Sequence, residues 1–227
     1  MMRPFVYVNM AMTADGKITS SAREYPRFTS DADRNNMDRL RAEADAIVVG
    51  AATMRADNPP LHVRNPEMRG HRSRLGKPPG LVRVLVTASG LIDPGSRFFE
   101  EEEGGRRIVA TVDSLAEERF AGIAGRAEIW KLGRERVDLR RLLEHLGRLG
   151  VERVLLEGGG ELNWAFVHDD LVDEFHITVA PTLLGGRDAP TLLEGDGFSM
   201  RTQQKLRLLD LRREGDEIYC SYAVVRE

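Results

Sequence analysis

Short apolar runs and stretches with helical spacing alternate along this chain from its beginning to its end. Runs rich in Val, Ile and Leu that stop at glycine or polar residues are typical of strands buried in a sheet. The runs that predict strands are Phe5–Met12, Ala46–Val49, Val82–Thr87, Ile108–Val112, Glu128–Leu132, Val151–Leu156 and Glu174–Ala180.

Helices are predicted where cap residues precede an apolar face. Thr29–Asp33 carries cap signals for a helix that runs to about Glu43. Shorter helices are expected over Ser114–Gly122 and Gly160–His168. Asp138 caps a further helix, which ends at Gly150 and places five leucines on one face, Leu139, Leu142, Leu143, Leu146 and Leu149.

The end of the chain has a different pattern. Lys205–Arg213 and Glu217–Val225 flank Gly215 and Asp216, which predicts a β-hairpin. Alternating strands and helices that finish in a hairpin indicate an α/β fold with a mostly parallel sheet and an antiparallel C-terminal edge. No linker interrupts the pattern, so we expect one domain over residues 1–227. Sheets of this kind bind ligands at the carboxyl ends of their strands.

Composition excludes several classes of protein. The net charge of −3 gives no overall attraction to nucleic acid or to an anionic membrane. The only cysteine, Cys220, excludes an internal disulfide, and its alternation with Ile218 predicts a core position. The N-terminus resembles neither a signal peptide nor a membrane span, so a cytoplasmic protein is expected. Three adjacent residues, His168, Asp169 and Asp170, point in different directions at a helix end and predict no metal site.

The segment from Val154 to Trp164 is the most informative part of the sequence. An apolar run stops at Glu157, passes through Gly158, Gly159 and Gly160, and enters a helix. A helix N-terminus with unpaired N–H groups and a bare backbone favours a phosphate. The alternative is a tight strand-to-helix turn that binds nothing.

Three other clusters follow predicted strands. Ala11–Lys17 leaves the first strand through a turn whose backbone could approach a flat ring. Thr53 and Asp57 follow another strand and share a face if their segment is helical. Thr87 to Gly90 offers hydroxyl groups suited to a ribose or a phosphate. Each cluster alone could be an ordinary loop.

Taken together, these motifs resemble the riboflavin-biosynthesis reductase family, whose fold resembles dihydrofolate reductase. The resemblance runs from about Pro4 to Val225 in the order expected of that family. Bifunctional members carry an N-terminal zinc deaminase, whose His-x-Glu and Cys-x-x-Cys ligands this chain lacks, so a stand-alone reductase is implied. The motifs are Met12–Lys17, Val49-Gly50 through Thr53 to Asp57–Pro59 and Leu61, Leu156–Gly160, and Ala180-Pro181 with Gly185-Gly186 and Ala189-Pro190.

The resemblance implies NADPH-dependent reduction of the ribosylamino side chain of a pyrimidine 5′-phosphate to ribitylamino. The substrate would be 5-amino-6-(5-phosphoribosylamino)uracil or its 2,5-diamino pyrimidinone counterpart, and the sequence does not distinguish them. Because the cofactor supplies the hydride, the protein mainly aligns the two reactants. The residues implied to contact the cofactor are Ala11, Met12, Thr53, Asp57, Thr87, Ala88, Ser89, Gly158, Gly159, Gly160, Glu161, Leu162 and Asn163.

Four residues are implied to contact the substrate, namely Arg41, Leu61, Arg64 and Glu157, and the catalytic residues would be Glu157 and Asp57. Arg41 and Arg64 could clamp the 5′-phosphate, although Arg41 at a helix end also suits the helix dipole. The basic stretch from Arg64 to Lys77 reads as a solvated loop.

Two positions depart from the family pattern. Thr87-Ala88-Ser89 stands where the family usually has Asp-Ser, which leaves the preference for NADPH over NADH open. Tyr25-Pro26-Arg27 replaces a usual Ser-x-Trp near the substrate, which leaves the pathway role open as well.

Two other functions fit the same sequence. One is a reductase of another pterin or folate substrate, and the other is a nucleotide-binding protein without turnover.

Whichever function is correct, the apolar residues of the C-terminal hairpin need to be covered by another surface, which predicts a homodimer. These residues are Leu206, Leu208, Leu211, Ile218 and Tyr222.

Overall fold

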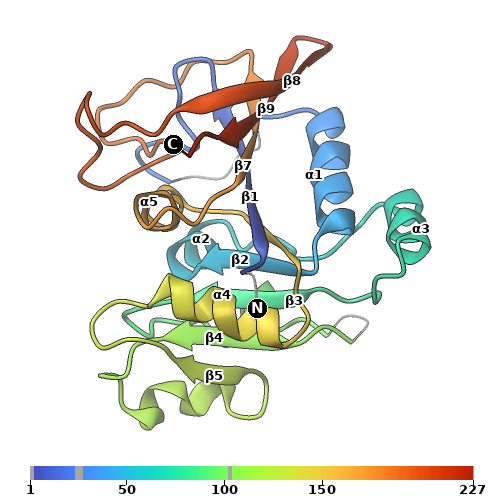
Figure 1. Cartoon of the computed structure of the whole chain (residues 1–227). Helices are drawn as coiled ribbons and strands as arrows, with labels where there is room; N and C mark the ends of the chain where they lie inside the picture. The colour runs from blue at the N-terminus through green and yellow to red at the C-terminus, as the bar shows by residue number, and fades with distance from the viewer. Residues whose placement is uncertain (1–2, 24–27, 102–103, 227) are drawn as a thin grey trace. The chain divides into compact units, whose positions relative to one another are not determined.

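A computed structural model describes residues 3–23, 28–101 and 104–226 (Figure 1). The expectations for Tyr25, Pro26 and Arg27 fall outside these described residues. The chain divides into two compact units. The first comprises Asp38–Leu155 together with the N-terminal residues up to Pro4, and the second comprises Phe5–Met37 and the chain from Leu156 on.

The first unit is built on a parallel sheet. Its strands have the order β5-β4-β3-β2-β6, and the pairs β2–β3, β3–β4 and β4–β5 are parallel. Val and Ile side chains at the strand centres, such as Val84 and Ile108, are completely buried, as expected for strands covered on both faces. The strands are β2 (Ala46–Gly50), β3 (Val82–Val86), β4 (Arg107–Thr111), β5 (Glu128–Lys131) and β6 (Arg153–Leu156).

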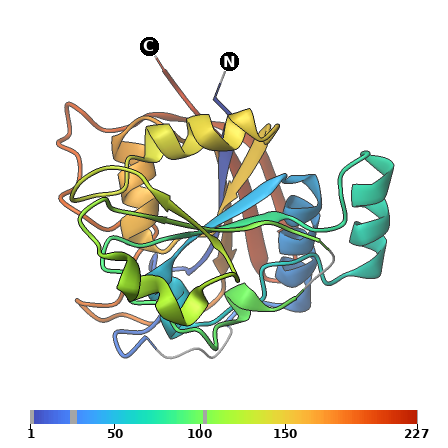
Figure 2. The same cartoon turned by 90° about the horizontal axis from the view of Figure 1, so that it is seen from below.

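One amphipathic helix, α4 (Leu139–Arg148), covers a face of these strands, and the 3₁₀ helix η1 (Arg97–Phe99) lies on the other side (Figure 2). Asp138 caps α4 as predicted by accepting a hydrogen bond from the Arg141 N–H at 3.0 Å. Four of the five predicted leucines are buried, each worth about 2 kcal/mol, whereas Leu149 at the C-cap is exposed. The short helix expected near Ser114 is the 3₁₀ helix η2 (Glu117–Ile123).

The solvated loop expected over the basic stretch is wrong, because Pro66–Arg74 forms a helix, α3. Asn65 caps it by accepting from the Glu67 N–H at 2.9 Å, and Pro66 occupies its first turn. Arg72 is 1% exposed, so this basic residue belongs to the core. The charge of this segment alone predicted a solvated loop, but the Asn65 cap and the buried Arg72 guanidinium group determine its structure.

The second unit contains the remaining strands in the order β1-β7-β9-β8. β1 (Phe5–Thr13) pairs in parallel with β7 (Glu174–Ala180), whereas β9 (Glu217–Val224) is antiparallel to both β7 and β8 (Leu206–Glu214). The helix α5 (Gly160–His168) also belongs here and has the predicted bounds. The expected α/β class, with a mostly parallel sheet and an antiparallel C-terminal hairpin, is confirmed, and a single domain stays a prediction.

The hairpin of β8 and β9, orange and red in Figure 1, has an exposed side. Every residue of β8 is exposed, and so is Ile218 in β9. Cys220 is only half-buried, so its predicted core position is wrong. The buried residues of β9 are Glu217 and Tyr219, because Glu217 accepts hydrogen bonds from the Ser30 N–H, the Ser30 hydroxyl and the Tyr219 hydroxyl.

The helix α1 (Asp31–Glu43) begins next to Ser30, as its cap signals predict.

Among the described residues, no helix is long and apolar enough to cross a membrane. In the same part of the chain, no group of three or more His, Cys, Asp or Glu side chains is placed to hold a metal ion.

Candidate active site

The glycine-rich connection after β6 leads directly into α5. Gly158 has a φ of +73°, which favours glycine, and Gly160 packs against the chain near Thr191. A Cβ at Gly160 would lie 2.6 Å from the Thr191 carbonyl oxygen, so no larger residue fits. Gly159 is the N-cap of α5 and has an ordinary extended conformation. The N–H groups of the first turn are therefore presented by a backbone without side chains at its start, which fits a phosphate.

The side chains of the first α5 turns differ in their surroundings. Asn163 is completely buried and donates its amide hydrogen to the Leu192 carbonyl oxygen at 3.0 Å. The Asn163 N–H also has a partner inside the protein, because it donates to the Gly159 carbonyl oxygen at 2.9 Å. Glu161 is exposed, and Leu162 is half-buried. The predicted pyrophosphate position thus rests on backbone groups rather than on these side chains.

Glu157 follows the last residue of β6 and is half-buried, which is compatible with contact to a ligand. A Cβ at the next residue, Gly158, would lie 2.4 Å from the methyl group of Met10 in β1. Ala11 and Met12 continue that strand and are half-buried. The structure therefore brings the glycine connection and the carboxyl-terminal half of β1 together within the second unit.

The turn after β1 is fixed by residues far along the chain. The Asp15 carboxylate accepts hydrogen bonds from the Thr13 hydroxyl at 2.6 Å and from the Leu184 and Gly185 N–H groups at 3.1 and 2.6 Å. These donors, the Thr13 hydroxyl foremost, lower the pKa of Asp15 to about 2. Lys17 also donates to the Ala189 carbonyl oxygen at 3.0 Å. Two of the sequence motifs are thus parts of one structural feature.

Thr53 and Asp57 lie at the carboxyl end of β2 in the first unit. The segment Ala51–Ala56 forms the helix α2, and the Asp57 N–H donates to the Thr53 carbonyl oxygen at 2.8 Å. The hydroxyl and the carboxylate are therefore one helical turn apart, as the sequence predicted. Both residues are half-buried, which suits contact with a ligand at this strand end.

The turn after β3 offers exposed groups at Ala88 and Ser89. Thr87 is buried instead, and its hydroxyl oxygen accepts a hydrogen bond from the Gly90 N–H at 3.1 Å. Arg119 of η2 donates to the Ser89 carbonyl oxygen at 3.4 Å. Sequence reasoning missed Arg119, because 30 residues separate it from Ser89 and no local pattern marks it.

The structure gathers the residues of the first unit that were predicted to contact the substrate around His62. Arg41, in the last turn of α1, is 1% exposed and donates to the His62 carbonyl oxygen at 2.9 Å. Arg64 forms an ion pair with Asp38 at 3.3 Å. Leu61, next to His62 in sequence, is buried. The two arginines therefore flank one loop, but each also has a partner inside the protein.

The electrostatic field at His62 is positive. Burial lowers the pKa of His62 below its usual value, and the charges of Arg41, Arg64 and Arg97 lower it further, against an opposing effect of Asp38. Cations that disfavour an imidazolium ion favour an anion at the same place. This field is what a phosphate site in the first unit requires.

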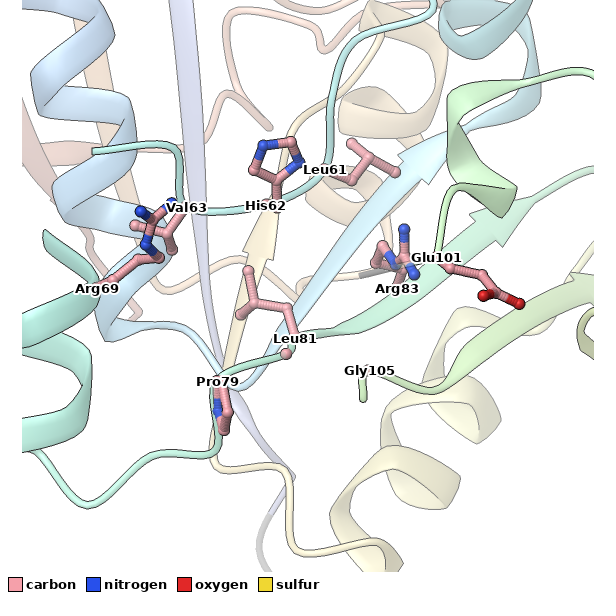
Figure 3. Close-up of a pocket in the computed structure, with 10 residues that line it drawn as sticks. Leu61, His62, Val63, Arg69, Pro79, Leu81, Arg83, Glu101 and Gly105 are labelled. Carbon is pink, nitrogen blue, oxygen red and sulfur yellow. The ribbon is translucent and has the colours of Figure 1, made fainter. Parts of the chain in front are cut away.

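A cavity of about 330 Å³ lies beside the same loop (Figure 3). Arg83 is buried there and donates to the Glu100 carbonyl oxygen at 3.0 Å. The cavity is at the amino ends of β3 and β4, whereas parallel sheets bind cofactors at the carboxyl ends, so it is not the predicted cofactor site. Its lining residues are Leu61, His62, Val63, Arg69, Pro79, Gly80, Leu81, Arg83, Glu101 and Gly105.

Comparison with known proteins identifies the family. A model of the RibD C-terminal domain matches residues 4–219. The chain belongs to this family. The resemblance inferred from the sequence motifs is therefore confirmed.

Two relatives are similar to this chain over nearly their whole length, and both are named 2,5-diamino-6-ribosylamino-4(3H)-pyrimidinone 5′-phosphate reductase. The protein of Archaeoglobus fulgidus is 40% identical over 215 residues, which are 95% of each chain. The protein of Methanothermobacter thermautotrophicus is 37% identical over 98% of this chain and 99% of its own. Riboflavin biosynthesis protein RibD of Actinobacillus pleuropneumoniae is 33% identical over 98% of this chain but only 57% of its own.

Solved structures support the fold. A pyrimidine reductase-like protein from Corynebacterium diphtheriae superposes with a TM-score of 0.83, at 22% identity, and covers 99% of this chain and 93% of its own. A deaminase/reductase from Thermotoga maritima gives a TM-score of 0.79 at 24% identity over 98% of this chain and 57% of its own. At these identities the likeness concerns the fold alone.

Proposed function

We propose that this protein is a 2,5-diamino-6-ribosylamino-4(3H)-pyrimidinone 5′-phosphate reductase of riboflavin biosynthesis. The observation that carries this proposal is the match to two reductases of that name over at least 95% of their lengths. RibD proteins match over a much smaller share of their own length. The 2,5-diamino substrate is therefore favoured over the deaminated uracil.

The reaction makes modest demands on the side chains. The ribosylamine opens to an imine, and C1′ must receive a hydride, which NADPH supplies when bound. What the protein contributes is alignment of the two reactants within reach of each other. In the second unit, we assign cofactor contacts to Ala11, Met12 and the backbone of Gly158–Leu162. We assign the sugar hydroxyls to Glu157, whose carboxylate can accept two hydrogen bonds.

In the first unit, we assign further cofactor contacts to Thr53, Asp57 and the Thr87–Ser89 turn. The substrate phosphate is assigned to Arg64 and Arg41 with Leu61, which is supported by the positive field at His62. Arg64 reaches the surface with a side chain that is 29% exposed, so it is the more accessible of the two arginines. A guanidinium group can bind phosphate through two parallel hydrogen bonds.

NADPH is proposed as the cofactor rather than NADH. The support is Arg119, which contacts the Thr87–Ser89 turn at the carboxyl end of β3. In dinucleotide sites at such strand ends, a nearby arginine accommodates the 2′-phosphate that distinguishes NADPH. Arg119 would recognise the 2′-phosphate in this chain, which lacks the Asp-Ser pattern usual in the family.

We also propose a homodimer that covers the hairpin. Large apolar side chains on β8 and β9 are between 42% and 60% exposed, and such a row on a strand pair favours association. Light scattering should give twice the chain mass at micromolar concentration, and a monomer would refute this part of the proposal. The exposed residues are Leu206, Leu208, Leu209, Leu211 and Ile218.

Turnover tests the whole assignment. Purified protein should consume NADPH with the 2,5-diamino substrate, more slowly with its deaminated counterpart, and not with dihydrofolate. Activity with dihydrofolate alone would favour a folate reductase, and binding of NADPH without turnover would indicate a nucleotide-binding protein.

A further inference from the structure

We propose that Asp38 is a positioning residue that holds Arg64 in the orientation needed for the substrate 5′-phosphate. This inference rests on the proposed function, because it assumes that Arg64 binds that phosphate. Asp38 lies in the C-terminal half of α1, and neither its position nor its neighbours in sequence mark it as part of a site. The structure alone brings it to Arg64.

The burial of Asp38 makes its pairing obligatory. The side chain is 3% exposed, and one carboxylate oxygen lies 3.3 Å from the Arg64 Nε atom. The other oxygen accepts a hydrogen bond from the Asn65 N–H at 3.0 Å. A buried carboxylate without a cation is strongly disfavoured. Asp38 therefore fixes both the backbone after Arg64 and the guanidinium group itself.

The surrounding segment is anchored by other contacts as well. Asn65 caps α3, and Arg72 near the other end of α3 donates to the carbonyl oxygens of Arg41 and Ala42 at 3.3 Å each. The segment from Arg64 to Arg72 is thus attached to α1 independently of Asp38. Replacing the Asp38 carboxylate by an amide should release the Arg64 side chain while leaving the helix in place.

Asp38 has two opposite effects on a bound phosphate. Its charge repels the phosphate, as its opposition to the arginines at His62 indicates. Its hydrogen bonds keep Arg64, a side chain with many rotamers, in one orientation, which reduces the entropy lost on binding. The Asp38 charge is already paired with the Arg64 guanidinium group, which offsets its repulsion of the phosphate. We therefore expect the orientation of Arg64 to affect phosphate binding more than the repulsion does. The sign of the change in KM decides between the two effects.

Steady-state kinetics of Asp38→Asn provide the first test. The KM for the phosphorylated substrate should rise about tenfold, while kcat and the KM for NADPH stay within a factor of two of the wild type. Glu43→Gln is the matched control, because Glu43 is an acidic residue of the same helix that pairs with Arg39 at 2.9 Å and with Arg153 at 4.0 Å. A lower KM in Asp38→Asn would show that Asp38 repels the phosphate, and an unchanged KM would show that it does not orient Arg64.

A double-mutant cycle provides the second test. If Asp38 acts through Arg64, Asp38→Asn should change the KM no further once Arg64→Ala is present. The double variant should also have a higher melting temperature than Arg64→Ala, because Arg64→Ala alone leaves the Asp38 carboxylate buried without its partner. Additive effects on KM would overturn the inference even if Asp38→Asn folds poorly. A normal KM in Arg64→Ala would instead refute the substrate role of Arg64, so the two failures are distinguishable.

Discussion

The glycine-rich connection after β6 and the basic segment from Arg64 to Lys77 teach different lessons about function in this protein. In the connection, glycines and the start of a helix follow one another along the chain, and the structure keeps that order. In the basic segment, the important contacts join residues far apart, such as Arg72 and the end of α1. Backbone features such as glycines and helix starts are local, so the sequence predicts them. The burial of a charged side chain depends instead on the residues that pack against it.

The largest expected effect concerns this buried charge. Arg72→Leu should lower the free energy of unfolding by about 3 kcal/mol, because carbonyl groups of Arg41, Ala42 and Pro78 would lose their donor. Arg74→Leu, at an exposed site on the same helix, should change it by less than about 0.5 kcal/mol. Urea unfolding of both variants measures the difference, and equal values would restore the solvated-loop interpretation.

The next effect tests the glycine-rich connection. Glu157→Gln should lower kcat about a hundredfold, because an amide offers one acceptor oxygen and misaligns C1′. The melting temperature and the affinity for NADPH should stay unchanged. A fall in melting temperature together with activity would assign Glu157 to a structural ion pair, and an unchanged kcat and KM would remove it from the site.

The cofactor preference should change less. Arg119→Ala should raise the KM for NADPH about tenfold and leave the KM for NADH unaltered, because only NADPH carries the 2′-phosphate. Arg126→Ala is a suitable control, since Arg126 is also exposed and donates to a carbonyl oxygen, that of Pro94. Equal changes with both cofactors would show that Arg119 does not recognise the 2′-phosphate.

The sequence anticipated most elements of the fold for physical reasons that can be named. β7 and α5 were predicted with their observed bounds, because β7 alternates apolar and polar residues and the glycines before α5 mark its start. Alternation failed in β9, where hydrogen bonds from Ser30 and Tyr219 bury Glu217 and leave Ile218 exposed.

The candidate site was anticipated unevenly. Thr53 and Asp57 were correctly placed one helical turn apart, since their spacing is local. Arg119 and Asp38 could not be found in this way, because their partners, Ser89 and Arg64, lie on other elements. Only the fold brings those pairs together.

The smallest expected effect is a pH dependence at His62. The pKa of His62 is lowered in the folded protein, so the unfolded chain takes up the proton first as the pH falls. Stability from this group is present above about pH 6.5 and is lost below it, toward the lowered pKa of the folded state. His62→Gln should therefore lose less stability than the wild type between about pH 6.5 and 5, as measured by thermal melting. Parallel losses in both proteins would show that His62 is not responsible.

The most direct test of the central claim is the product formed from 2,5-diamino-6-ribosylamino-4(3H)-pyrimidinone 5′-phosphate and NADPH. Mass spectrometry of the reaction should show a gain of two hydrogen atoms by the substrate, with one NADPH consumed for each product molecule. With NADPH deuterated at the transferred position, one deuterium should appear at C1′. An unchanged substrate in the presence of folded, NADPH-binding protein would contradict the proposed reductase.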